Sequence, residues 1–199
     1  MGSLNKFNLK DYIEKYNSNV FLETGTWTGD GVYYASHFSF EKLFSIELVK
    51  DLFLRAEQRF INNNKIKIIN DNSCDGIKSI LQNFIQKDDR VIFWLDAHLP
   101  QFYCNGIDDR YDVNTKILIP LEEELKIIKN NKNISNDVFL IDDLRIYEEG
   151  PYKAGNWYDV VNSKVYTEGI KFVEDLIGDT HTVVKDYDDQ GYIICAPKK

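Results

Sequence analysis

Short apolar runs recur along the chain, and each of them ends at a polar or acidic residue. Continuous apolar runs of four to eight residues are typical of strands in a parallel sheet that is covered on both faces. We therefore expect five buried strands in the first three quarters of the chain. They are Val20–Leu22, Leu43–Ile46, Ile66–Ile69, Val91–Leu95 and Val138–Ile141.

Segments with helical spacing lie between these runs. Ile77, Ile80, Leu81 and Phe84 follow the i, i+3, i+4, i+7 pattern of an amphipathic helix. Two further helices are expected over about 30–37 and over about 49–60, the second with Leu52, Ala56 and Phe60 on one face. Another should begin near Pro120 and carry Leu121, Leu125 and Ile128. The last is expected around Ile170, Val173 and Ile177.

The end of the chain has a different pattern. Thr182–Val184 and Gly191–Cys195 flank a polar turn, which predicts an antiparallel pair. Strands alternating with helices and closed by such a hairpin predict a single doubly wound, Rossmann-like α/β domain. Its sheet would be mostly parallel and seven-stranded.

The 199 residues are too few for a second full domain, so we assign 1–199 to one domain. Residues 4–18 are expected to form a helix that covers one edge of the fold or the mouth of the site. Residues 98–116 and 144–161 are expected to form two long loops, a kind of segment that is often functional.

The stretch Val20–Gly31 combines the first strand with three closely spaced glycines, Gly25, Gly29 and Gly31. This is how a buried strand looks when it enters a glycine turn and then a helix. Glycines let a backbone approach a ligand closely, and the helix N-terminus offers free N–H groups. An ordinary strand–turn–helix without a ligand has the same local pattern.

The spacing of these glycines narrows the ligand class. A dinucleotide fingerprint that starts at Gly25 needs glycines where Trp27 and Asp30 stand. A P-loop is excluded because the Gly-Lys-Ser/Thr sequence is missing. Pyrophosphate binding is therefore disfavoured.

All five predicted parallel strands end in an acid or a polar cluster. In doubly wound folds ligands bind at the carboxyl ends of the strands, so these residues are candidates for a ligand site. The alternative is an acidic rim that only solvates the strand ends. The candidates are Glu23, Glu47, Asn70–Ser73, Asp96–His98 and Asp142–Asp143.

The pattern Glu23-x-Gly25-x-x-x-Gly29 resembles motif I of the class I S-adenosylmethionine (SAM) dependent methyltransferases. The resemblance covers about residues 20–196 and departs from the common Asp-x-Gly-x-Gly-x-Gly form at Trp27. It implies SAM as cofactor, with the methionine end at the glycine turn, the ribose at Glu47 and the adenine at Asp71 to Ser73. The implied cofactor contacts are Glu23, Thr24, Gly25, Thr26, Gly29, Glu47, Asp71, Asn72, Ser73 and Asp96.

A narrower resemblance links Trp94-Leu95-Asp96 and Ile141-Asp142-Asp143 to metal-dependent sugar O-methyltransferases of the macrocin O-methyltransferase kind. It implies that Asp96, Asp142 and Asp143 bind Mg²⁺, a hard cation that takes carboxylate oxygens. The chain has Ala97-His98 where that family commonly has a second acid. Near Asp96, a neutral His98 suits a general base, although a supporting or loop-capping role remains an alternative.

We therefore predict an O-methyltransferase that acts on a small polyhydroxylated acceptor, a sugar or a nucleotide sugar. Alternatives are an NAD-type oxidoreductase of similar fold and a non-catalytic binding protein. Aromatic residues of the two loops would face the acceptor or pack the loops onto the domain. They are Phe102, Tyr103, Tyr111, Tyr147, Tyr152, Trp157 and Tyr158.

Composition limits the partners. The net charge is −8 without a basic stripe, which argues against nucleic acid because binding phosphates needs clustered Lys and Arg. No apolar run reaches the roughly 20 residues of a membrane span. The absence of a leader pattern and of paired cysteines among Cys74, Cys104 and Cys195 predicts a cytoplasmic protein with reduced thiols. The oligomeric state is left open, a homo-oligomer included.

Overall fold

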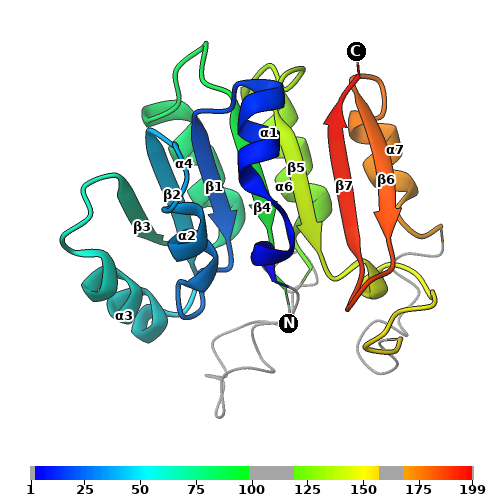
Figure 1. Ribbon diagram of the computed structural model, residues 1–199, viewed down its shortest axis with the longest axis horizontal. Helices are drawn as coiled ribbons and strands as arrows, with labels where there is room; N and C mark the ends of the chain where they lie inside the picture. Colours follow the sequence, from blue (N-terminus) through cyan, green and yellow to red (C-terminus); the bar gives the residue numbers. More distant parts are fainter. Residues whose placement is uncertain (1–2, 99–118, 157–167, 199) are drawn as a thin grey trace.

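The computed structural model describes residues 3–98, 119–156 and 168–198. Its core is a seven-stranded sheet with the order β3-β2-β1-β4-β5-β7-β6 (Figure 1). The strands β1 to β5 pair in parallel, and β7 runs antiparallel to both β5 and β6. The predicted fold class is confirmed. The strands are β1 (Val20–Thr24), β2 (Lys42–Glu47), β3 (Ile66–Asn70), β4 (Val91–Leu95), β5 (Val138–Asp142), β6 (His181–Asp186) and β7 (Tyr192–Pro197).

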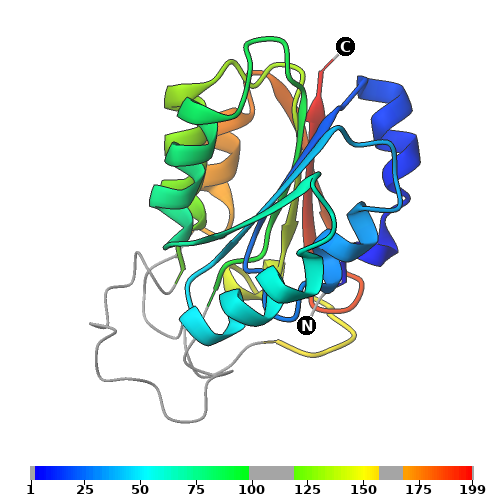
Figure 2. The ribbon, with the colours of Figure 1, turned by 90° about the vertical axis from the view of Figure 1, so that its left-hand side faces the viewer.

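Helices cover both faces of this sheet (Figure 2). One face is covered by α1 (Leu9–Tyr16), α2 (Asp30–Ala35) and α3 (Lys50–Phe60), and the other by α4 (Ser73–Asn83), α6 (Leu121–Asn131) and α7 (Lys171–Ile177). The apolar strands therefore have a core on each side. Phe21 of β1 packs into the core on the side of α1 to α3, and its neighbour Leu22 packs into the core on the side of α4, α6 and α7.

The strand register brings the carboxyl ends of the central strands to one edge of the sheet. Thr24 pairs with Ile46 on one side and with Leu95 on the other, and Glu47 pairs with Asn70. This is the lower edge in Figure 1. The segments that follow β1, β2, β3, β4 and β5 therefore meet there.

The N-terminal segment differs from the single covering helix expected over residues 4–18. It forms a short 3-10 turn, η1 (Leu4–Lys6), followed by α1. Phe7 between them is extended, and its buried ring packs 6.0 Å from that of Trp94 and 5.2 Å from that of Tyr192. Anchoring this ring in the core interrupts the helix.

Three local details also differ from the expectations. Helix α3 buries Phe53 with Ala56 and Phe60, whereas Leu52 is only half-buried. Helix α2 ends at Ala35, two residues before the expected end. The loop expected over 144–161 begins with a 3-10 turn, η3 (Leu144–Ile146). Of the loop expected over 98–116, only His98 lies within the described residues.

None of the helices in the described ranges is long and apolar enough to cross a membrane.

Candidate functional site

The glycine turn after β1 is packed so tightly that side chains do not fit. Gly25 has φ +81, and a Cβ atom there would lie 2.6 Å from the backbone oxygen of Asp96. A Cβ atom on Gly31 would lie 1.9 Å from Oε1 of Glu23. The turn therefore presses directly on the end of β4 and on the Glu23 carboxyl. Gly29, with φ +84, instead packs against the ring of Phe60.

Glu23 is buried at the end of β1. The Ser45 hydroxyl donates a hydrogen bond to Oε2 of Glu23 at 2.5 Å and lies 2.6 Å from the Thr26 hydroxyl. Burial raises the pKa of Glu23 to about 8, so the carboxyl is mostly protonated at pH 7. A cation beside it would favour the ionised form.

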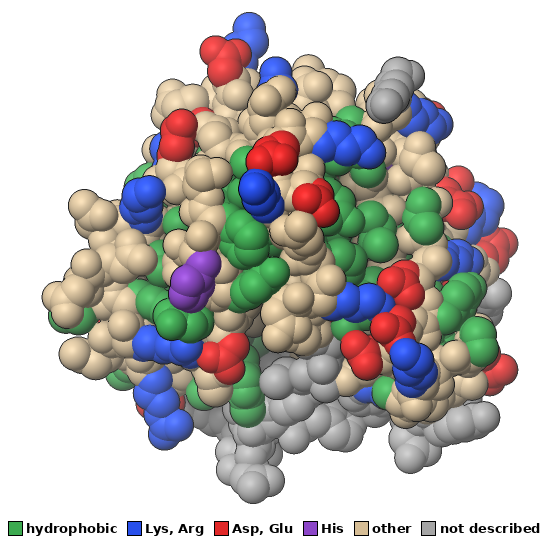
Figure 3. All heavy atoms as spheres, viewed as in Figure 1, with side chains coloured by type: hydrophobic (Ala, Val, Ile, Leu, Met, Phe, Trp, Pro, Cys, Tyr) green, Lys and Arg blue, Asp and Glu red, His purple; other side chains and the backbone are tan. Residues whose placement is uncertain are grey.

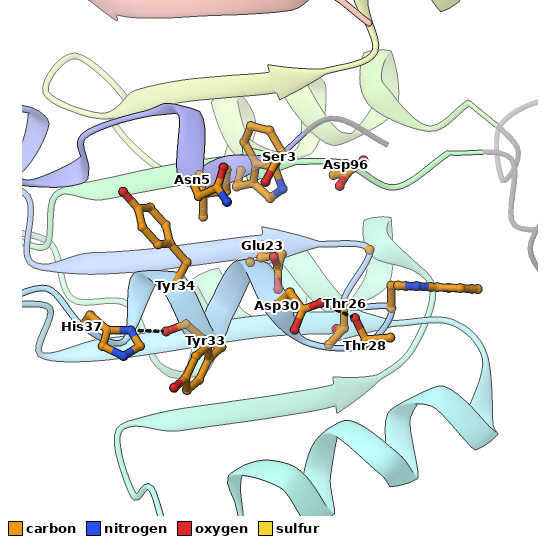
Figure 4. Close-up of a pocket in the computed structure, with 15 residues that line it drawn as sticks. Ser3, Asn5, Glu23, Thr26, Thr28, Asp30, Tyr33, Tyr34, His37 and Asp96 are labelled. Carbon is orange, nitrogen blue, oxygen red and sulfur yellow. Dashed lines mark hydrogen bonds between the residues drawn. The ribbon is translucent and has the colours of Figure 1, made fainter. Parts of the chain in front are cut away.

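A cavity of about 540 Å³ opens beside this turn. That volume lies within the range of small-molecule sites. Four predicted contacts line it, namely Glu23, Gly25, Thr26 and Asp96. Figure 4 shows Glu23 between the residues of η1 on one side and Asp30 of α2 on the other.

The N-terminal segment was expected at one edge of the fold or at the mouth of the site, and its turn η1 forms a wall of the cavity. Asn5 of this turn and Ser3 directly before it line the cavity. The turn is held by Lys6, whose Nζ lies 3.0 Å from Asp186, and by the Tyr192 hydroxyl, which accepts a hydrogen bond from the Ser3 N–H at 3.2 Å. No periodicity in the sequence indicates this contact.

Glu47 is placed at the end of β2 as expected, but it does not line the cavity. Its carboxylate accepts hydrogen bonds from the N–H groups of Trp27 and Val49, each at 2.8 Å. Glu47 thus fixes the glycine turn to the start of α3. Each of its oxygens keeps a lone pair that can accept one more hydrogen bond.

The segment after β3 has a structural task of its own. Asn72 is the N-cap of α4, since its side-chain oxygen accepts a hydrogen bond from the Asp75 N–H at 2.9 Å. Asp71 accepts a hydrogen bond from the Asn72 N–H at 2.9 Å. Both side chains therefore help to begin the helix, and Ser73 is its first residue.

The ends of β4 and β5 bring His98 between two carboxylates. His98 Nε2 lies 2.7 Å from Oδ2 of Asp143, and His98 Nδ1 lies 3.5 Å from Oδ1 of Asp96. Asp143 is buried in the left-handed conformation with φ 56, and its Oδ1 accepts a hydrogen bond from Arg145 Nε at 3.1 Å. Arg145 was not singled out from the sequence.

Asp142 completes this group of acids. Both of its carboxylate oxygens are buried, and neither has a hydrogen-bond partner among the described residues. Burial, followed by the neighbouring Asp143, raises the pKa of Asp142 to about 6. Burial, then Asp142 and Asp143, raise the pKa of Asp96 well above its ordinary value. Crowded carboxyls of this kind attract a cation.

The geometry nevertheless differs from an open metal site. Within residues 3–98, 119–156 and 168–198, no group of three or more His, Cys, Asp or Glu residues is arranged to hold a metal ion. Asp143 is directed to His98 and Arg145, which leaves Asp96 and Asp142 as the open carboxyls. The expected Mg²⁺ site is therefore not confirmed.

Two of the loop aromatics pack onto the domain, which was one of the two roles expected for them. Tyr147 and Tyr152 are buried, and the Tyr152 hydroxyl donates a hydrogen bond to the Glu148 carbonyl at 3.0 Å. The other five aromatics of that prediction lie outside the described residues. The other histidines differ from each other: His181 is buried against the Asp137 carbonyl, while His37 is exposed at the rim of the cavity.

Comparison with known proteins places the fold. No family model and no curated protein matches this chain. Among solved structures, an O-methyltransferase from Bacillus cereus in complex with SAH (S-adenosylhomocysteine) matches with a TM-score of 0.58 and 14% identity, covering 96% of this chain and 79% of that chain.

Two further structures agree. A Staphylococcus aureus protein assigned as a caffeoyl-CoA O-methyltransferase matches with a TM-score of 0.60 and 16% identity over 100% of this chain and 85% of that chain. An rRNA methylase from Streptococcus thermophilus matches with a TM-score of 0.51 and 12% identity over 94% of this chain and 93% of that chain. The chain thus has the fold of methyltransferases.

Proposed function

We propose that the protein is a SAM-dependent O-methyltransferase. The observation that carries this proposal is the glycine turn, in which Gly25 lies against the end of β4 and opens a cavity between Glu23 and Asp96. A structural neighbour of the same fold contains SAH, the product of methyl transfer from SAM. SAM carries a sulfonium and an ammonium group, which suit a cavity with acidic walls.

The candidate contacts divide along the cofactor. Glu23, Gly25, Thr26 and Asp96 would hold the methionine end, because they line the cavity. Glu47 would accept hydrogen bonds from the ribose hydroxyls with the lone pairs that its backbone partners leave free. The adenine would lie at Asp71, Asn72 and Ser73. Thr24 and Gly29 would act through the shape of the turn.

His98 would take the proton of the acceptor hydroxyl during in-line transfer of the methyl group. With its proton on Nε2, which lies 2.7 Å from Oδ2 of Asp143, the neutral imidazole would have its lone pair at Nδ1, on the side of Asp96. Arg145 holds the other oxygen of Asp143. The ring is therefore oriented with its basic nitrogen toward the cavity residue Asp96.

The acceptor that we propose is a small polyhydroxylated molecule, a sugar or a nucleotide sugar. The net charge of −8 supports this class over nucleic acid. On the face shown in Figure 3, basic side chains are scattered among acidic ones and form no continuous patch. A mass-spectrometric screen for methylated products, with nucleotide sugars in one arm and rRNA in the other, tests the choice; methylation of rRNA alone would overturn it.

We expect calorimetric titration to show binding of SAM and no binding of NAD. The physical reason is the glycine spacing, which suits the sulfonium cofactor better than a pyrophosphate. Tight binding of NAD without binding of SAM would show the oxidoreductase alternative to be correct. Binding of SAM without transfer to any acceptor in the screen would favour the non-catalytic alternative.

We also propose that Mg²⁺ assists the reaction. Asp96 and Asp142 would hold the ion, with Asp143 beside it, because the carboxyls are crowded and neither oxygen of Asp142 has a hydrogen-bond partner among the described residues. Bound Mg²⁺ would lower the pKa of the acceptor hydroxyl.

Asp142→Asn and EDTA should each abolish methyl transfer and leave the affinity for SAM nearly unchanged. The reason is that the ion would contact the acceptor oxygen and leave the cofactor pocket intact. Turnover assays and SAM titrations check both results, with addition of Mg²⁺ after EDTA as the control. Full activity in EDTA would rule the metal role out.

A further inference from the structure

Glu124 interrupts an otherwise apolar face of α6. Leu121, Leu125 and Ile128 of this face are all buried in the core between α6 and the sheet. Glu124 shares their helical spacing and is only 1% exposed. Burial raises the pKa of its carboxyl to about 7. A carboxyl at a position where the spacing favours a leucine breaks a local rule, and such breaks are expected at functional sites.

The surroundings of Glu124 connect it to the strand ends. The hydroxyls of Ser73, the first residue of α4, and of Thr24, the last residue of β1, lie near its carboxyl and favour the ionised form. His98 is also near enough to favour the ionised form of this carboxyl whenever the imidazole carries a proton on both nitrogens. Oε1 of Glu124 has no hydrogen-bond partner in the part of the chain that the structure describes.

Thr24 links this carboxyl to the end of β4. Its Oγ1 accepts a hydrogen bond from the Asp96 N–H at 3.3 Å, and the same hydroxyl can donate its proton to Glu124. The Glu124 side chain thus lies near the start of α4, where we place the adenine, and near the Thr24 hydroxyl, which accepts the hydrogen bond from the Asp96 N–H.

We propose that Glu124 is a positioning residue of the methyl-transfer site. Its carboxyl holds the hydroxyls of Thr24 and Ser73 and so fixes the Asp96–His98 segment relative to the start of α4. This inference rests on the proposed function, because it assigns the two segments to the cofactor and to the proton acceptor.

The energetics separate this role from a purely structural one. A buried carboxyl with an unpartnered oxygen costs stability, whereas a leucine would continue the apolar face of Leu121, Leu125 and Ile128. A residue kept for stability alone would not carry this cost. Replacement by leucine is therefore expected to stabilise the fold and to disturb the site.

The test compares Glu124→Leu and Glu124→Gln with the matched control Glu123→Leu, which makes the same change at the half-buried neighbouring position. Each variant is measured by thermal unfolding, by SAM titration and by the NMR signals of the His98 imidazole. The chain has three histidines, so these signals are assigned from the spectrum of His98→Ala. No acceptor has to be known.

For Glu124→Leu we expect a raised Tm, SAM affinity weakened roughly tenfold through the loss of hydrogen bonds, and shifted His98 signals. Glu124→Gln should restore affinity and signals, since its amide oxygen accepts from hydroxyls. Glu123→Leu should match the wild type in affinity and signals.

The proposal would be overturned if Glu124→Leu kept wild-type SAM affinity and unshifted His98 signals. It would also be overturned if Glu124→Leu lowered the Tm, Glu124→Gln restored the Tm, and the His98 signals changed in neither variant. A failure of the proposed function appears separately, as the absence of SAM binding in the wild-type protein.

Discussion

Replacing His98 by alanine should lower turnover by roughly 10²–10⁴-fold, the usual contribution of a general base. The affinity for SAM should stay nearly unchanged, because His98 is not among the residues that line the cavity. The loss is expected because one imidazole nitrogen lies 2.7 Å from Asp143 and the other is on the side of Asp96. Steady-state kinetics at saturating SAM and a SAM titration check the two parts.

His37→Ala is the matched control for this experiment. His37 lies at the rim of the cavity, is exposed, and makes its ring contact with the Tyr33 carbonyl at 2.9 Å. Its removal should leave turnover at saturating SAM within about threefold of the wild type, because its ring contacts Tyr33 and not the acids at the ends of β4 and β5. If His98→Ala lowered turnover by less than tenfold, His98 would be excluded as the general base.

The second large effect is expected at the glycine turn. Gly25→Ala should lower the Tm and abolish measurable SAM binding, because its Cβ would lie 2.6 Å from the backbone oxygen of Asp96. Backbone cannot move aside as the end of a flexible side chain can, so the turn or the end of β4 must shift. The residue also has φ +81, where a side chain adds strain.

Gly155→Ala separates the two causes. Gly155 has nearly the same conformation, φ +78, and a Cβ atom there would meet no described residue within 4 Å. This variant should lose only about 1–2 kcal/mol from backbone strain and keep SAM binding. Both variants are measured by thermal unfolding and by SAM titration. The difference between Gly25→Ala and Gly155→Ala in stability and in SAM affinity then gives the effect of the contact with Asp96. Equal losses of stability with SAM binding retained in both variants would contradict a tight turn.

Much of the fold was predictable because its signals are local. The continuous apolar runs that became β1, β4 and β5 are buried along their whole length, and a strand needs only a few consecutive residues to show this pattern. Alternation with helical spacing then defined the parallel sheet. The prediction was weaker at the N-terminus, because the extended Phe7 follows from packing against Trp94 and Tyr192, both far away in sequence.

The candidate site was predictable only as a set of positions. Any parallel sheet brings the ends of its strands to one edge, so Glu23, Glu47, Asp96 and Asp142 were expected near one another. Which partner each acid has depends on contacts that the sequence does not display. Glu47 is held by the backbone of the turn, whereas Asp142 has no partner among the described residues.

The sequence by itself thus determined the alternation of strands and helices, the glycine turn and the acids at the strand ends, since each depends on neighbours along the chain. Only the tertiary structure decided that Asp143 lies against His98, that the N-terminal segment lies at the cavity through η1 and that Glu124 lies near Thr24. These contacts join residues from different elements. They depend on side-chain packing between elements, which local spacing leaves undetermined.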